Sequence, residues 1–443
     1  MAAKEFDVVV VGAGILGMSS AYHLQKNNPK KRILVLARFG GAGQGNTGRS
    51  NAMFRNTFTS SDNQTLSDTT ISFYLHLQVN QNQELGLEQI GYLWLMSERQ
   101  LAANERHVEG MVRNKIEIRE YGKRELEQLV PGIRTEFGES EEEAKILKLD
   151  RVAGSIFGVK CGRLDPDRLI EFYRDRFIGM GGTVAFNTDA VKLMVEAHES
   201  LDIEGEPFVW QEARVNGVEV RGALEGEIRA DTVVMAAGAW NNELLEPRGM
   251  DGHVKAKKRQ LFSIPAGNDP SLVNLLYTKG FNELGLLPMV ILPKAGVHFK
   301  PVRIADEFWV ACEDEANRPF INLPDHDLGA YTAEASFYDR NVHPVLKGYF
   351  PQFRNARPKR MWAGLYSYNT LDYLPFVVPG YGLILVGGDS GSGIMKGDAL
   401  GRIVDSAYRE GKDSEAMLYG EVPYRVSKLG FENRDVEREE WVI

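Results

Sequence analysis

Residues 7–17 read DVVVVGAGILG, four valines that run into the pattern Gly12-x-Gly14-x-x-Gly17. A continuous β-branched run is typical of a strand buried on both faces of a parallel sheet. Apolar side chains recur at helical spacing from Ile15, so the glycines stand where a strand turns into a helix. In that setting Gly12 permits a tight turn, Gly14 lets a pyrophosphate approach the backbone, and Gly17 lets the helix pack on the strand. The stretch therefore predicts a dinucleotide site at a helix N-terminus.

The next predicted strand departs from the usual dinucleotide pattern. Residues 32–36 read RILVL, and an acid that holds the adenosine ribose normally follows such a strand. Here Ala37 and Arg38 follow instead. Arg38 could bind the 2′-phosphate of NADP, lie over the adenine, or be a solvated charge. The partner of the ribose stays open.

Length and composition limit the class of protein. The chain has 443 residues, enough for two domains, and its net charge of −9 argues against nucleic acid as a main partner. The two cysteines, Cys161 and Cys312, lie far apart, so we expect no disulfide framework, no metal site and a cytoplasmic setting. Every apolar run is too short for a transmembrane helix. The oligomeric state stays open.

Further along, a Gly/Ser/Thr/Asn-rich stretch at 40–65 predicts a long functional loop. We expect charged helix over 101–145 and a capped helix start at 162–166. The basic run 255–259 indicates an exposed strand face rather than an anion site. The remaining expectations are strands near 181–195, a hairpin over 195–222, a buried strand in 230–240, antiparallel strands over 255–312, and a buried strand at 382–388 that runs through a glycine turn into a helix at 400–408.

These blocks together resemble the D-amino-acid oxidase/sarcosine oxidase superfamily of FAD enzymes, and within it the archaeal dye-linked L-proline dehydrogenases. The motifs that carry the resemblance are Gly12-x-Gly14-x-x-Gly17, Asn46-Thr-Gly-Arg49-Ser with Arg55, Ala236-Ala-Gly238-Ala-Trp240 and Gly388-Asp-Ser-Gly391-Ser-Gly393. The resemblance implies an α/β (α+β) fold. A Rossmann-like FAD domain of the glutathione-reductase type would comprise 1–85, 152–243 and 368–443, and an interleaved antiparallel-sheet substrate domain would comprise 86–151 and 244–367.

The resemblance also implies a set of FAD contacts along the chain. Some family oxidases attach the flavin through a cysteine just before a tyrosine-containing strand, which here reads 362–368 and contains no cysteine. We therefore expect non-covalent FAD. The implied cofactor residues are Gly12, Gly14, Ile15, Leu16, Gly17, Arg38, Asn46, Thr47, Arg49, Ser50, Val191, Ala237, Gly238, Trp240, Gly391, Ser392, Gly393, Ile394, Met395 and Lys396.

Four residues are candidates for the chemistry. An amino-acid substrate needs its carboxylate anchored, which a bidentate arginine does well. We assign Arg55 to that carboxylate and Arg49 to the flavin face, although either could simply pin the loop to backbone carbonyls. Tyr366 matches a family tyrosine of the substrate cage or is a core aromatic, and Lys396 lies one residue beyond a family carboxylate-binding lysine. On weaker grounds, His298 and Lys300 could line the same pocket.

The expected activity is hydride transfer from the carbon of a secondary amine such as L-proline to flavin N5. Electrons would pass to a dye, a quinone or a redox protein, which allows a cytoplasmic location or one peripheral to a membrane. Sarcosine oxidases of the family activate O₂ with a lysine on the strand that corresponds to 307–313, where this chain has Val310. That difference favours a dehydrogenase. The alternatives are an oxidase that uses O₂, a 2-hydroxy-acid dehydrogenase, and a flavoprotein subunit of an electron-transfer complex.

Overall fold

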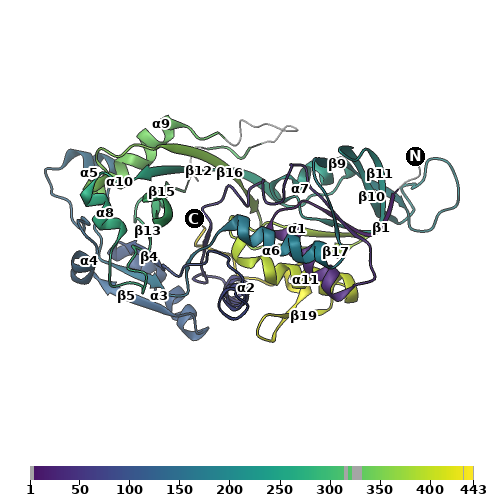
Figure 1. Ribbon diagram of the computed structural model, residues 1–443, viewed down its shortest axis with the longest axis horizontal. Coiled ribbons are helices and arrows are strands. Elements are labelled where there is room, and N and C mark those ends of the chain that lie inside the picture. Colours follow the sequence, from purple (N-terminus) through teal and green to yellow (C-terminus); the bar gives the residue numbers. More distant parts are fainter. Residues whose placement is uncertain (1–3, 314–317, 322–331, 433, 443) are drawn as a thin grey trace.

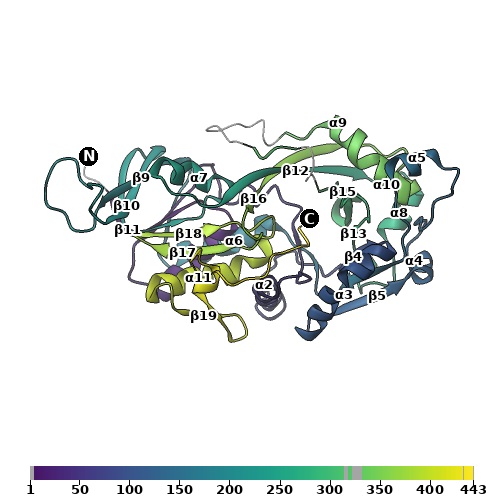
Figure 2. The ribbon, with the colours of Figure 1, turned by 180° about the vertical axis from the view of Figure 1, so that it is seen from behind.

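The computed structural model describes residues 4–313, 318–321, 332–432 and 434–442. Figure 1 shows an elongated molecule with one large sheet in each half, and Figure 2 shows the same arrangement from behind. The C-terminal segment lies between the two halves in both views. This placement brings the last described residues to the junction where the candidate site is built.

The first sheet has eight strands, and the valine run lies near its centre. Val8, Val9 and Val10 in β1 (Lys4–Val11) are completely buried. β1 pairs in parallel with two neighbours, as expected for a strand covered on both faces. The spatial order is β17 (Phe376–Gly380), β18 (Leu383–Gly387), β11 (Gly226–Met235), β1, β2 (Ile33–Leu36) and β8 (Thr183–Ala185), with the hairpin of β9 (Thr188–Ala197) and β10 (Ala213–Gly222) attached to β11.

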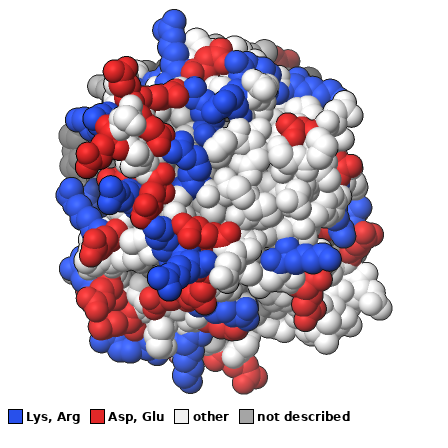
Figure 3. All heavy atoms as spheres, turned by 90° about the vertical axis from the view of Figure 1, so that its left-hand side faces the viewer, with Lys and Arg blue, Asp and Glu red and all other residues white. Residues whose placement is uncertain are grey.

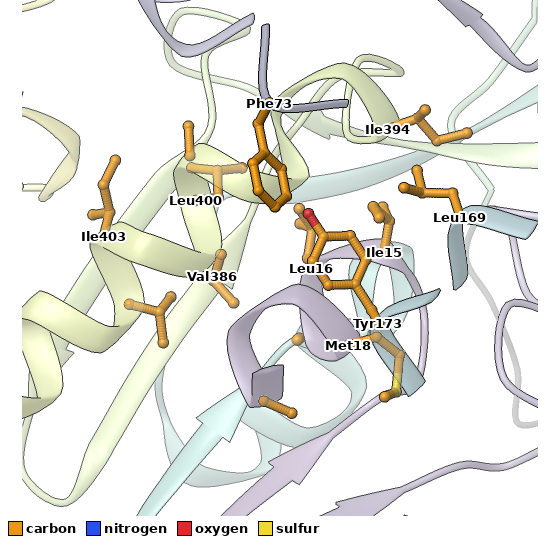
Figure 4. Close-up of a cluster of buried hydrophobic side chains, with 14 of the residues drawn as sticks. Ile15, Leu16, Met18, Phe73, Leu169, Tyr173, Val386, Ile394, Leu400 and Ile403 are labelled. Atoms are coloured by element: carbon orange, nitrogen blue, oxygen red, sulfur yellow. The ribbon is translucent and has the colours of Figure 1, made fainter. Parts of the chain in front are cut away.

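Four helices cover one face of this sheet. They bury a shared apolar cluster, which Figure 4 shows with Ile15, Tyr173 and Leu400 drawn from three different helices. α6 begins at the predicted cap, because the Asp165 carboxylate accepts from the backbone N–H groups of the first turn. The helices are α1 (Ile15–Asn27), α2 (Ser61–Asn80), α6 (Pro166–Gly179) and α11 (Gly397–Glu410). The hairpin of β19 (Glu415–Leu418) and β20 (Val422–Arg425) packs against α11, whereas α7 (Asn241–Leu245) packs against β9.

A buried ionic group joins α1 to α11. Nε2 of His23 lies 2.8 Å from Oδ1 of Asp398, and Nε of Arg402 donates to Oδ2 at 2.7 Å. Asp398 has no exposed surface. A buried carboxylate needs such partners to offset its desolvation, so the group holds the two helices in one relative position. Both helices begin at the pocket described below.

The second sheet also has eight strands and is antiparallel, except where β13 pairs in parallel with β4. Its aromatic core includes Phe262, Phe299 and Phe308, which are all buried. The spatial order is β16 (Arg360–Asn369), β12 (Val254–Pro265), β15 (Glu307–Ala311), β14 (His298–Val302), β13 (Met289–Ile291), β4 (Tyr92–Met96), β6 (Gly154–Gly158) and β5 (Ile118–Gly122).

Short helices surround the second sheet, and small elements connect the halves. β3 (Met53–Phe54) and β7 (Gly162–Arg163) form a two-stranded ladder. The helices are α3 (Glu98–Arg113), α4 (Lys123–Leu129), α5 (Glu142–Leu147), α8 (Pro270–Leu276), α9 (Ala335–Phe337) and α10 (His343–Tyr349). The short turns of helix are η1 (Gly238–Trp240), η2 (Glu246–Arg248), η3 (Arg303–Ala305), η5 (Tyr338–Val342), η6 (Pro351–Phe353), η7 (Ile394–Lys396) and η8 (Val426–Leu429).

Three local predictions were wrong. The expected helix over 101–145 is interrupted by β5, which extends the sheet beside β6. The expected run of strands over 255–312 contains α8, which begins after an Asp269 cap and a proline at its first position. The basic run 255–259 is not an exposed face, because Lys257 and Arg259 are 3% and 5% exposed.

The mixed α/β fold class is confirmed. The division into five domain segments stays a prediction. Within the segment 152–243, which the sequence assigns to the FAD domain, β6 pairs with β4 and β5 of the second sheet.

Across the described ranges no helix is both long and apolar enough to cross a bilayer. Figure 3 views the left-hand side of Figure 1, where lysine and arginine interleave with aspartate and glutamate beside an uncharged area. On this face the interleaved charges of both signs do not produce the single-sign field that nucleic acid requires.

Candidate flavin and substrate site

The predicted glycine turn forms part of the wall of a pocket between the two sheets. Gly12 has a φ of +108°, and a Cβ there would lie 2.5 Å from the carbonyl oxygen of Ala236. A Cβ on Gly14 would lie 3.2 Å from Oγ1 of Thr47. Gly12, Gly14, Ile15 and Leu16 line the pocket, as predicted. Gly17 does not line the pocket. A Cβ on Gly17 would lie 1.9 Å from the carbonyl oxygen of Gly12, so its role is to let α1 pack closely on the turn.

A second glycine turn enters the pocket from β18 and leads into η7 and α11. Gly391 has a φ of +82°, and a Cβ on it would lie 2.2 Å from the ring of Tyr366. Gly391, Ser392, Gly393, Ile394 and Met395 all line the pocket. The N-termini of α1 and α11 therefore both face it, and helix N-termini favour negatively charged groups.

Lys396 lies just behind this second turn rather than in the pocket wall. It has no exposed surface, and its Nζ donates to Oγ of Ser392 at 2.6 Å. Nζ also lies 4.7 Å from the centre of the Phe58 ring. Burial lowers the pKa of Lys396 to about 7. The structure therefore places the ammonium one side chain away from the pocket.

Apart from the two residues of β3, the loop predicted at 40–65 is irregular up to α2, and it is fixed to β16. Oδ1 of Asn46 accepts from the backbone N–H of Leu365 at 2.8 Å, and the carbonyl of Arg49 accepts from Nε1 of Trp362 at 3.1 Å. Oγ1 of Thr47 accepts from the backbone N–H of Ile15 at 3.1 Å. The loop thus joins both sheets. Its pocket-lining residues include Asn46, Thr47, Arg49 and Ser50, and Ala237, Gly238 and Trp240 line the pocket from η1 and the residue before it.

The far end of the pocket lies at the C-terminal end of β2. Ala37, Arg38, Asp189 and Ala190 line it, whereas Val191, the predicted adenine contact, does not. Nε of Arg38 donates to Oδ1 of Asp189 at 2.8 Å. A second carboxylate, that of Glu243, lies 3.4 Å from the guanidinium. Two carboxylates around one guanidinium disfavour the 2′-phosphate of NADP at this point.

Arg55 lies at the other end of the pocket and is 5% exposed. Its guanidinium donates to the backbone carbonyls of Thr57 and Trp441 and lies 3.9 Å from the centre of the Phe58 ring. Among the residues that the structure describes, no carboxylate forms an ion pair with it. Burial lowers the pKa of Arg55, and the charge of Glu439 opposes that shift.

The C-terminal segment completes this end of the pocket. The Glu439 carboxylate is buried and accepts from Thr59 and Asn63 at 3.0 Å each. The Trp441 ring lies 4.6 Å from that of Trp94. Glu439 and Trp441 both line the pocket, and no local pattern around either residue predicts this.

Tyr366 lies in the wall contributed by β16, and burial raises its pKa. The guanidinium of Arg259, on the neighbouring strand β12, lies 5.1 Å from the centre of the Tyr366 ring. Arg259 also donates to the Tyr368 hydroxyl. It lines the pocket and is the main residue that the sequence interpretation missed. Period-two alternation with the apolar Leu261, which lines the same pocket, could have indicated its inward face.

Two residues with weaker sequence support lie on one face of β14. His298 lines the pocket, with Nδ1 2.8 Å from the carbonyl of Gly296. Burial lowers its pKa to about 4. Lys300 is 1% exposed, its Nζ donates to the carbonyl of Asn51, and Nζ lies 4.4 Å from the centre of the Trp309 ring. Burial lowers the pKa of Lys300 well below its usual value.

Comparison with known proteins agrees with this geometry. The family model described as "FAD dependent oxidoreductase" (DAO) matches residues 7–407. The chain belongs to the DAO family. It is 26% identical over 423 residues to FAD-dependent oxidoreductase domain-containing protein 1 of Bos taurus, covering 91% of this chain and 81% of that protein. It is 30% identical over 129 residues to sarcosine oxidase subunit beta of Rhodobacter capsulatus, covering 29% of this chain and 31% of that protein.

Solved structures share the fold. L-proline dehydrogenase from P. horikoshii superposes with a TM-score of 0.70 at 20% identity, over 92% of this chain and 94% of that one. NikD, an amino acid oxidase of nikkomycin biosynthesis, superposes with a TM-score of 0.69 at 19% identity, over 99% and 98% of the two chains.

The family cofactor, FAD, fits the residues present. A Cβ at Gly12 or Gly391 would clash with neighbouring atoms, so both turns can pass this close to the pocket only as glycine. Two helix N-termini also face the pocket. Gly12 and Gly14 would hold the pyrophosphate, and the turn from Gly391 to Met395 would hold the flavin end. The DAO family member described here is thus an FAD-dependent oxidoreductase.

Proposed function

We propose that this DAO family protein is a dehydrogenase that oxidises a secondary-amine amino acid such as L-proline and passes the electrons to a quinone or a redox protein. The proposal is supported by the proteins that share its fold or sequence, which include an L-proline dehydrogenase, glycine oxidases and a sarcosine oxidase subunit. A cytoplasmic location is part of the same proposal.

The observation that carries the proposal is the environment of Arg55. A buried guanidinium usually has a carboxylate partner, because neutral carbonyls only partly offset the desolvation of a charge. Arg55 lines the pocket and has backbone carbonyls as its hydrogen-bond partners in the described ranges. The carboxylate of an amino acid that entered the pocket would supply the missing negative charge.

The surroundings of Arg55 also suit the amine. Tyr92, Tyr366 and Trp441 line this end of the pocket and exclude water. Desolvation and the nearby cations Arg55 and Lys396 lower the pKa of a bound ammonium group, so the amine loses its proton without a dedicated base. Bound FAD supplies the hydride acceptor. The chain itself anchors the carboxylate, orients the carbon and keeps the amine neutral.

Anaerobic reduction of the purified holoprotein tests the proposal. L-Proline, sarcosine, glycine, L-alanine and L-lactate are each mixed with the oxidised protein, and bleaching of the visible flavin band is recorded. We expect the secondary amines L-proline and sarcosine to bleach the flavin fastest. Fastest bleaching by L-lactate would instead identify a 2-hydroxy-acid dehydrogenase, and no bleaching by any of them would identify an electron-transfer subunit.

One observation favours a second candidate, an oxidase. β15 has no basic residue from Phe308 to Ala311, but the ammonium of Lys300 on the paired strand β14 lies over the Trp309 ring. Its acceptor is the carbonyl of Asn51, which itself lines the pocket. A cation this close to the pocket could stabilise negative charge on reduced oxygen. The rate at which reduced protein reacts with O₂ separates the two candidates.

A further inference from the structure

The adenosine end of the pocket lacks the residue that usually binds its ligand. In dinucleotide-binding folds an acid after the second strand accepts hydrogen bonds from the ribose hydroxyls. In this chain β2 ends at Leu36 and Ala37 follows, so that carboxylate is missing. A ribose bound there without an acceptor would lose a charge-assisted hydrogen bond.

A carboxylate from a distant part of the chain lies beside the vacant position. The backbone N–H of Thr188 donates to the carbonyl of Ala37 at 2.9 Å, so the start of β9 is bonded directly to the end of β2. Asp189 is the next residue after Thr188, and it lines the pocket together with Ala37. Its carboxylate is therefore adjacent to the position that the usual acid occupies.

The Asp189 carboxylate is also held in place. Arg38 directly follows Ala37, and its Nε donates to Oδ1 of Asp189 at 2.8 Å. The side chains of Arg38 and Asp189 are 23% and 18% exposed, so water screens this pair only partly. A fixed carboxylate loses little conformational freedom when a ligand binds, which favours tight recognition.

We infer that Asp189 binds the ribose hydroxyls of the FAD adenosine, in place of the acid that is missing at Ala37. Arg38 orients Asp189 and does not itself bind a phosphate. Glu243 balances the remaining charge of Arg38 from outside the pocket wall, because it contacts Arg38 without lining the pocket. This inference concerns the cofactor alone and does not depend on the substrate.

Titration of the apoprotein with two ligands tests the inference. The first is FAD, and the second is its analogue that carries 2′-deoxyadenosine. We expect the unmodified protein to bind FAD about 10-fold more tightly than the analogue, as one hydrogen bond to a charged group implies. Asp189→Ala should bind the two ligands equally, and Asp189→Asn, which keeps the shape of the side chain, should discriminate less than the unmodified protein.

Glu243→Gln is the matched control, because Glu243 contacts the same guanidinium. It should keep the full preference for FAD. Loss of the preference in Glu243→Gln would show that the effect acts through Arg38 and would overturn the assignment. An unchanged preference for FAD in Asp189→Ala would also overturn it. So would a loss of affinity for an analogue in which hypoxanthine replaces adenine, because the protein would then recognise the adenine amino group. Thermal unfolding of each apoprotein confirms that the variants are folded.

Discussion

The guanidinium of Arg55 donates a hydrogen bond to the backbone carbonyl of Trp441, a residue 386 positions later in the chain. Trp441 packs on Trp94 of the second sheet, and its Nε1 donates to Asn104 at 2.8 Å. Arg55 therefore both faces the pocket and fixes the C-terminal segment against it. Because the backbone of the C-terminal segment holds the Arg55 guanidinium, this group has a well-defined position before any substrate binds.

Replacing Arg55 by lysine keeps the positive charge but removes the planar fork of donors. We expect KM for the amino acid to rise by the equivalent of about 1.5–3 kcal/mol, the usual value of a hydrogen bond to a charged group. Steady-state kinetics with a dye acceptor measures this change. Trp441→Phe, which retains the backbone carbonyl, is the control and should alter KM less. An unchanged KM in Arg55→Lys with full flavin content would return Arg55 to a structural role.

The flavin should dissociate when the protein is denatured. Neither Cys161 nor Cys312 lies on the tyrosine-containing strand β16, although Cys312 lines the pocket. Acid precipitation should leave the yellow colour in the supernatant. Colour that stays with the pellet would demonstrate covalent attachment, and its loss in Cys312→Ser would identify the attachment residue.

Reaction with oxygen should be slow and should not depend on Lys300. If the protein is a dehydrogenase, substrate-reduced protein will reoxidise slowly in air and rapidly with a quinone, and Lys300→Met will not change the slow rate. Stopped-flow mixing with oxygenated buffer measures both rates. Rapid reoxidation with stoichiometric hydrogen peroxide would instead make the protein an oxidase. In that case Lys300→Met should slow the reaction about 100-fold or more, because it removes an electrostatic contribution of a few kcal/mol.

His298 should make the fold sensitive to mild acid. Burial lowers its pKa to about 4, with the nearby charges of Arg259 and Lys300 acting in the same direction. The unfolded chain, in which histidine has a pKa near 6.5, binds more protons than the native state between pH 4 and 6.5. Stability therefore falls as the pH falls through that range, by about 3 kcal/mol from this residue. His298→Gln should lose less stability over the same range in urea unfolding, and equal losses would exclude this role.

Adding an acid at the usual ribose position should not help this protein. Ala37→Glu would place a second carboxylate beside Asp189, and like charges at close range repel. We expect FAD to bind several-fold more weakly, on the order of 1 kcal/mol, in a fluorescence titration. Tighter binding would mean that the ribose lacks an acceptor in the unmodified protein. In an Asp189→Ala background the same substitution should restore affinity.

The sequence correctly predicted the elements of the fold whose determining residues lie close together along the chain. The valine run, the glycine turn and α1 follow from side chains within thirty residues of one another, and the same holds for β18, its turn and α11. β5 was missed because none of its residues Ile118–Gly122 is buried, so the strand lacks an apolar pattern and forms by pairing with β6, more than thirty residues later.

The candidate site was harder to predict where residues from distant segments meet. Arg38 and Asp189 are 151 residues apart, so the sequence alone could not show that one orients the other. Arg259 was interpreted as solvated because it lies in a run of charged residues, yet alternation along β12 turns it inward beside Tyr366. Lys396 was predicted at the site, but its position depends on the helical turn η7, and it lies behind the pocket wall, where its Nζ donates to Ser392.

The order of segments around the pocket has a consequence for biosynthesis. Gly12 is synthesised several hundred residues before Met395, Glu439 and Trp441, which line the same pocket. The sheet that contains β1 also lacks β17 and β18 until residues 376–387 are made. A nascent chain thus leaves the edge of β11 that pairs with β18 exposed from the synthesis of Met235 until Leu383 is made, and unpaired edges of this kind promote aggregation. The pocket can therefore be complete only after Trp441 has been made, and the yield of holoprotein in a cell should depend on chaperones and on free FAD.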